Sequence, residues 1–101
     1  MIVVNIKKKD NLINEIIIKG HAKYDEYGKD IVCASISSIV ITTINALLRI
    51  DQDSIKYQES DGLINIQVLK HSDVIDKLII NMIELLKDLQ RQYRKNIKIN
   101  D

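Results

Sequence analysis

The chain has 101 residues, with 15 Lys and Arg against 14 Asp and Glu and a formal net charge of +1. This length predicts one domain, residues 1–101, and the balanced charge argues against direct nucleic-acid binding through phosphate neutralisation. One cysteine rules out an internal disulfide. No run of 18 or more uncharged apolar residues occurs and the N-terminus lacks the order of a signal peptide, so we expect a soluble, cytoplasmic protein that has no membrane contact.

The first twenty residues predict two antiparallel strands. Residues 1–7 place Ile2, Val4 and Ile6 on one face, as in a half-buried strand. The polar residues that follow supply a turn, and the apolar run of residues 12–19 predicts a second strand that ends at Gly20.

Residues 31–50 predict a helix even though β-branched side chains crowd the segment. Twenty residues without a turn signal are too many for an ordinary strand. Asp30 is a natural N-cap, because its carboxylate can accept from backbone N–H groups two or three residues further on. The segment is so apolar that we expect the helix to be buried on most sides.

The second half of the chain predicts a hairpin and another helix. Asp61-Gly62 is a strong turn signal between the strand-like segments 54–60 and 63–69. From about Asp73, apolar residues recur at helical spacing, and residues 96–100 could add a short last strand. The predicted order is β-β-α-β-β-α, with a possible C-terminal strand. It describes an α+β fold with a small antiparallel or mixed sheet and two helices on one face.

The cysteine at position 33 is the first candidate for chemistry. A free cysteine is ordinarily a small buried hydrophobe. With Asp30 as N-cap, however, Cys33 lies in the first turn of the helix, where the helix dipole and unpaired N–H groups favour a thiolate. The same N–H groups could hold a developing oxyanion. A merely structural cysteine has no need of that location.

The histidine at position 21 is the candidate base. His21 follows the second predicted strand, and the loop of residues 22–30 is short enough to bring it and Cys33 to one edge of the sheet. A Cys–His pair within reach of each other is the minimum for a thiol hydrolase. Their spacing alone is a weak signal, because a lone histidine is more often a surface residue. We interpret His71, with no cysteine or acid obviously near, as such a surface residue.

Two further residues surround this pair. Capping fully explains Asp30, although its carboxylate could also orient the loop or His21. Ser37 lies one turn beyond Cys33 on the same helix face, within reach of a substrate or of the Cys33 backbone. Serines inside helices more usually bond the preceding turn.

Three segments resemble a known family: "GHA" at 20–22, "YDEYGKDIVCASIS" at 24–37 and "YRKNIKI" at 93–99. They are similar to the ribosomal-processing cysteine protease family, Prp, and the resemblance spans the whole chain in size and element order. Its specific part is the combination Gly20-His21-Ala22, Gly28, Asp30-Ile31-Val32-Cys33-Ala34 and Ser37.

The resemblance implies a single cysteine protease domain. The implied reaction is endopeptidase cleavage that removes a short N-terminal extension from a protein of the large ribosomal subunit. Cys33 matches the family's nucleophile and His21 its general base, while Gly20, Asp30 and Ser37 match positions that surround the dyad. The resemblance also implies a homodimer, a hydrophobic groove near Cys33, no metal and no organic cofactor.

Two alternatives belong to other functional classes. A non-catalytic module that binds a ribosomal protein or the nascent ribosome would use the dyad only for structure. Near-neutral charge argues against it, since rRNA binders usually show a basic face, and the basic clusters at 7–9 and 91–95 are typical of solvated ends. A thiol redox protein is disfavoured because the chain has no resolving cysteine. The sequence leaves open whether loop 23–29 closes before substrate arrives and whether a third residue orients His21.

Overall fold

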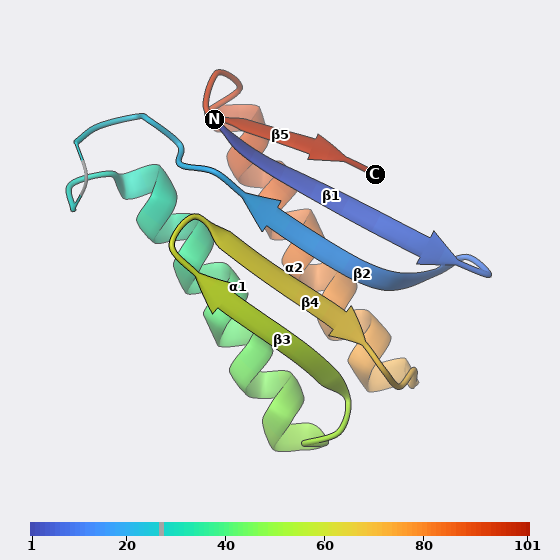
Figure 1. Ribbon diagram of the computed structural model, residues 1–101. Helices are drawn as coiled ribbons and strands as arrows, with labels where there is room; N and C mark the ends of the chain where they lie inside the picture. Colours follow the sequence, from blue (N-terminus) through green and yellow to red (C-terminus); the bar gives the residue numbers. More distant parts are fainter. Residues whose placement is uncertain (27) are drawn as a thin grey trace.

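The computed structural model describes residues 1–26 and 28–101, which form a five-stranded mixed sheet with two helices packed on one face (Figure 1). Along the chain the elements are β1 (Ile2–Lys9), β2 (Leu12–Lys19), α1 (Ile31–Ile50), β3 (Ile55–Ser60), β4 (Leu63–Val68), α2 (Asp73–Gln92) and β5 (Ile97–Asn100). The predicted α+β class and element order are confirmed, and the C-terminal strand is present.

The strands lie in the order β3-β4-β2-β1-β5. Neighbouring strands are antiparallel except for β5, which runs parallel to β1 and pairs Ile97 with Ile2. This parallel pair places the start of β5 beside the N-terminal end of β1 (Figure 1). The segment that follows α2 therefore lies close to the end of β2, where His21 begins the loop to α1.

Two tight turns set the register of the sheet. Asp10 and Asn11 join β1 to β2 with φ of 54° and 64°, a left-handed pair that suits the twist of a two-residue hairpin. Asp61 and Gly62 join β3 to β4, with Gly62 at φ 69°. The predicted hairpin at Asp61-Gly62 is confirmed.

Helix α1 has the predicted bounds and the predicted cap. The Asp30 side chain accepts from the N–H groups of Val32 and Cys33. The expectation that this helix is buried on most sides is wrong. Ile31 and Ile50 are 53% and 51% exposed, because the sheet and α2 cover only one side of α1. The buried stripe consists of Val32, Ile36, Val40, Thr43, Ile44 and Leu47.

By length and composition, α1 is the one helix among the described residues that could cross a membrane. The core helix of a soluble protein meets the same criteria. Its buried stripe packs against the sheet and α2 as part of an aliphatic core built mainly from Ile, Val and Leu. Helix α2 lies beside α1 on the same face of the sheet and contributes to that core, and Ser72 caps its N-terminus by accepting from the N–H of Ile75.

Gly20 ends β2 in a conformation that admits no side chain. Its φ is 96°, and a Cβ built there would lie 2.5 Å from the carbonyl oxygen of Met1. Its N–H donates to the carbonyl of Gly62 at 2.9 Å. Glycine at this position therefore lets the backbone before His21 pass between the chain start and the β3–β4 turn.

We predict that Gly20→Ala lowers the free energy of unfolding by about 3 kcal/mol or more, because left-handed strain adds to a backbone clash. Gly28→Ala is the matched control. Gly28 has a similar φ of 85° but nothing within 4 Å of an added Cβ, so only the backbone penalty of roughly 1–2 kcal/mol remains. Urea denaturation followed by circular dichroism measures both variants, and equal losses would contradict the close approach to Met1.

Candidate active site

The sulfur of Cys33 lies at the start of α1 and contacts the backbone beside His21. Cys33 is the third residue of the helix and is partly buried. The N–H of Ala22 donates to Cys33 Sγ at 3.3 Å. The structure thus brings Cys33 against the residue that directly follows His21.

His21 and Cys33 line two adjoining clefts. The larger, of about 1020 Å³, lies between α1 and the β3–β4 hairpin and has an apolar wall that includes Ile18, Ile36 and Leu63. The smaller, of about 520 Å³, is bounded by the loop before α1. Among the described residues, no hydrogen bond joins the His21 ring directly to Cys33. Catalytic hydrogen bonds of this kind are often long in free enzymes and tighten only with substrate bound.

Asp30 holds both the helix start and the loop. One carboxylate oxygen accepts from the N–H groups of Val32 and Cys33, each at 3.0 Å. The other accepts from Tyr24 at 2.9 Å and Asp25 at 3.3 Å. Burial opposes ionisation, but these N–H groups, that of Cys33 foremost, outweigh it and hold the pKa of Asp30 below its ordinary value. Asp30 therefore caps and orients the loop, and neither of its oxygens contacts His21 in the described structure.

Three of the N–H groups at the helix start, which the sequence suggested could hold an oxyanion, already have acceptors in this structure. Those of Val32 and Cys33 point to the Asp30 carboxylate, and that of Ala34 donates to the Asp30 carbonyl at 3.1 Å. All three donors are occupied. The N–H of Ala22 is the remaining backbone donor that contacts Cys33 Sγ.

Ser37 lies one turn after Cys33 and lines both clefts. The nearby hydroxyls of Ser35 and Thr43 donate to carbonyls four residues earlier. Within the described residues, the exposed Ser37 hydroxyl makes no such bond. It is therefore available to a molecule bound in the clefts, as the sequence position suggested.

Asn96 belongs to the site although sequence spacing gave no sign of it. Its side-chain Nδ2 donates to the carbonyl of Ala22 at 2.9 Å, and its own carbonyl accepts from the N–H of Ile2 at 2.8 Å. Tyr93 packs edge-on against Tyr24 with ring centroids 5.4 Å apart. The only available signal was the segment 93–99, which carried part of the family resemblance.

The second histidine lies away from this site. His71 Nδ1 is 2.7 Å from Asp76 Oδ1, so the expectation that no acid lies near it is wrong. The acid comes from the first turn of α2, and His71, which lies just before the N-cap Ser72, reaches back to it. Asn96 follows the opposite end of that 20-residue helix, which is about 30 Å long.

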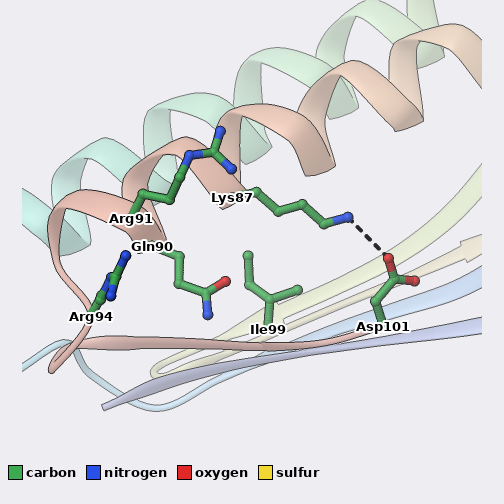
Figure 2. A pocket seen from close by; sticks show the side chains of 6 residues that line it. All are labelled: Lys87, Gln90, Arg91, Arg94, Ile99 and Asp101. Carbon is green, nitrogen blue, oxygen red and sulfur yellow. Dashed lines mark hydrogen bonds and ion pairs between the residues drawn. The ribbon is translucent and has the colours of Figure 1, made fainter.

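A third cavity lies between the C-terminal half of α2 and β5, with a volume of about 490 Å³ (Figure 2). Lys87 extends along it and pairs with Asp101 at 3.1 Å (Figure 2). Lys8 reaches the same carboxylate, and the two lysines lower the pKa of Asp101. Arg91 pairs with Asp88. The basic side chains that line this cavity are thus largely paired with acids, and no nucleophilic side chain lines it.

Within residues 1–26 and 28–101, no group of three or more His, Cys, Asp or Glu side chains is arranged to hold a metal ion. The groups described above at the junction of the two clefts are Cys33, His21 and Ser37, together with the backbone around them.

The family model described as cysteine protease Prp matches residues 1–98. The chain belongs to this family. It is accordingly a cysteine protease, which is a hydrolase, and the family resemblance stated from residues 20–37 and 93–99 is confirmed.

Curated relatives and solved structures match over nearly the whole chain. The ribosomal processing cysteine protease Prp of Staphylococcus aureus (strain Mu50) is 31% identical, covering 99% of this chain and 98% of the relative. That of Mycoplasma genitalium is 32% identical, covering 100% and 96%. The crystal structure of the S. aureus protease with a covalently linked product peptide has a TM-score of 0.93 at 29% identity, covering 99% of this chain and 98% of that one.

We predict that Asp30→Asn lowers the free energy of unfolding at neutral pH by about 1 kcal/mol, because asparagine still caps the helix but its amide nitrogen cannot accept from Tyr24 and Asp25. The pKa of Asp30 is lowered on folding, so its contribution is full above the ordinary value of 3.8 and is lost as pH falls through the folded value. The difference between the two proteins should therefore shrink in acid.

Urea denaturation at a series of pH values measures this convergence. Asp53→Asn is the charge-matched control, since the exposed Asp53 side chain lies beyond the far end of α1 and should change stability little. A stability difference for Asp30→Asn that is independent of pH would contradict the role given to the ionised carboxylate.

Proposed function

We propose that the protein is the endopeptidase that removes the N-terminal extension of a large-subunit ribosomal protein, with Cys33 as nucleophile and His21 as general base. The observation that carries the proposal is the hydrogen bond from Ala22 N–H to Cys33 Sγ, which joins the start of α1 to the residue after His21 inside one cleft. Cys33 and His21 both match the dyad that the family resemblance implies. The relatives' name, ribosomal processing cysteine protease, supports the substrate class.

The larger cleft suits a peptide with hydrophobic side chains. Apolar side chains from β1, β2, α1 and the β3–β4 hairpin line one wall, and the opening reaches Cys33 and His21. The resemblance implies an extension that ends in a hydrophobic, aromatic-rich stretch. Seated in this cleft, such a stretch would present its scissile carbonyl to Cys33, while the residues that follow would occupy the smaller cleft beside the loop.

The reaction follows from the groups at the junction of the two clefts. His21 takes the proton of the Cys33 thiol, and the thiolate attacks the scissile carbonyl carbon to form a C–S bond. The Ser37 hydroxyl is one donor for the oxyanion, and the Ala22 N–H, which donates to Cys33 Sγ before the reaction, is released to be the other as the C–S bond forms. His21 then protonates the leaving amine as the C–N bond breaks. Water, activated by His21, hydrolyses the thioester and regenerates the thiol.

The same chain is proposed to act as a homodimer in the cytoplasm. The outer face of α1, defined here as Ile31, Ala34, Ser38, Thr42 and Asn45, is exposed in the single chain. These residues follow the three- and four-residue spacing of one helix face. A two-fold contact between two copies would cover this surface. A single cysteine without a disulfide and a ribosomal substrate both fit the cytoplasm.

The non-catalytic ribosome-binding module is the less favoured candidate. Membership of a protease family argues against it, and the basic clusters are partly matched by acids. Lys7 pairs with Glu15, Lys8 with Asp101 and Arg91 with Asp88. Direct binding to rRNA is therefore not expected.

We predict that Cys33→Ala and His21→Ala each lower single-turnover cleavage by at least about a thousandfold, because a pair that acts as a unit loses most of its function with either member. The substrate is a peptide that spans the extension and the first residues of the mature ribosomal protein. Cys33→Ala removes the nucleophile but no large contact, so the peptide should still bind.

His71→Ala is the matched control, because it removes the chain's other histidine and should leave cleavage unchanged. Intact mass of the products gives the cut site, and fluorescence anisotropy follows binding separately. Substantial cleavage by folded Cys33→Ala protein would refute the mechanism. Binding without any cleavage by the wild-type protein would favour the non-catalytic module.

We predict that the wild-type protein sediments as a dimer at micromolar concentration and that Thr42→Glu shifts it toward monomer. A two-fold axis through the outer face of α1 would bring the two introduced carboxylates near each other, where like charges repel. Asn81→Glu adds the same charge at an exposed position on α2 and should leave the dimer intact. A wild-type monomer would contradict the dimer, and equal effects of both variants would contradict the use of α1.

A further inference from the structure

The β3–β4 turn lies directly against the His21 side chain. The N–H of Gly20, the residue before His21, donates to the carbonyl of Gly62 at 2.9 Å. A Cβ built on Gly62 would lie 3.1 Å from His21 Nε2 and 3.6 Å from its Cε1. The imidazole therefore packs against the backbone of the turn at the one position that carries no side chain (Figure 1 shows the turn beside the first turns of α1).

The neighbouring residue of the turn supplies a carboxylate to the same ring. Asp61 Oδ1 lies 3.8 Å from His21 Nε2. Asp61 makes no other ion pair or hydrogen bond with a described residue, so its carboxylate is free to follow the ring. Its side chain is 83% exposed and that of His21 is 47% exposed, so the interaction is electrostatic support near solvent rather than a buried pair.

The other charged groups around the clefts are committed elsewhere or lie beyond ion-pair distance. Glu59 comes from the hairpin, and Lys23, Asp25 and Asp30 come from the loop. Asp30 accepts from four N–H groups, and Asp25 Oδ1 accepts from the N–H of Glu26 at 2.7 Å. Among the described residues, Asp61 is the only carboxylate within 4 Å of the His21 ring nitrogens.

We propose that Asp61, together with the backbone at Gly62, is a positioning element for His21. The inference rests on the proposed role of His21 as general base. When Cys33 gives its proton to His21, a thiolate and an imidazolium form, and the Asp61 carboxylate stabilises the imidazolium on its Nε2 side. Nδ1 is then the nitrogen that exchanges the proton with Cys33. Asp61 takes no part in the proton transfer and acts only through His21, as the carboxylate of a catalytic triad does.

The test is Asp61→Asn, which removes the charge and keeps the turn, because Asn-Gly is at least as favourable a turn pair as Asp-Gly. We expect kcat/KM for the extension peptide to fall about threefold to tenfold with KM nearly unchanged. The alkaline limb of the kcat/KM profile should move about half a pH unit lower, the size expected for one exposed ion pair. Asp61→Glu keeps the charge and should return the alkaline limb most of the way to its wild-type position.

Asp53→Asn removes an equal charge beyond the far end of α1 and should leave the profile unchanged. The ¹⁵N chemical shifts of the His21 ring, followed against pH in the free protein, give a readout that does not depend on cleavage. They should move with Asp61→Asn and not with Asp53→Asn. An unchanged pH profile and unchanged ring shifts in Asp61→Asn would overturn the inference.

The two proposals fail differently. If the wild-type protein does not cleave the peptide, the proposed function is wrong, and if Cys33→Ala or His21→Ala protein still cleaves it, the proposed dyad is wrong. If both variants lose cleavage while Asp61→Asn behaves as the wild-type protein does, only the positioning role of Asp61 is wrong. Gly62→Ala adds a second measurement, since its methyl group would displace the ring. It should change the His21 shifts as well as kcat, whereas strain in the turn alone would change stability only.

Discussion

The site depends on one carboxylate that accepts hydrogen bonds from four backbone N–H groups. Asp30 caps α1 through Val32 and Cys33 and holds the loop through Tyr24 and Asp25. The cap decides where the helix begins, so it decides that Cys33 falls in the first turn. The bonds from Tyr24 and Asp25 fix the position of the loop that leads from His21 to the helix. These bonds favour the ionised carboxylate, so the arrangement is electrostatic in origin. It is stabilised in the pH range in which Asp30 carries its charge.

Segments far apart in the sequence complete what Asp30 begins. Gly20 passes between Met1 and Gly62, Asn96 holds the Ala22 carbonyl, and the Ala22 N–H reaches Cys33 Sγ. The parallel pairing of β5 with β1 places Asn96 there, and the pairing of β2 with β4 places the hairpin turn. The sheet order is thus what turns a weak spacing of twelve residues between His21 and Cys33 into a defined site.

How much could be predicted from sequence follows from the range of each interaction. The bounds of α1 and its cap were predictable, because capping and helix length are local properties. The hairpin turns and the element order were predictable for the same reason. The role of Asn96 and the contact of Gly62 with His21 were not, since contacts between distant segments leave no periodic pattern. The pairing of His71 with Asp76 spans only five residues and was overlooked rather than hidden by distance. The cap predicted the bonds from Val32 and Cys33, whereas the bonds from Tyr24 and Asp25 to the other carboxylate oxygen depend on the loop conformation.

Helix α1 contributes to the core, to the clefts and to an exposed outer face, and these three surfaces explain its composition. Val32, Ile36 and Val40 recur every four residues and pack in the core, while Cys33 and Ser37, each one position later, face the clefts. Positions 34, 38 and 42 face outward and carry small side chains. Because the core stripe and the cleft stripe are adjacent on one rigid helix, packing of the aliphatic core fixes the direction of the Cys33 side chain. The third surface is left exposed by the single chain and is the one proposed above for a second copy, with Ala34 at its edge also lining the smaller cleft.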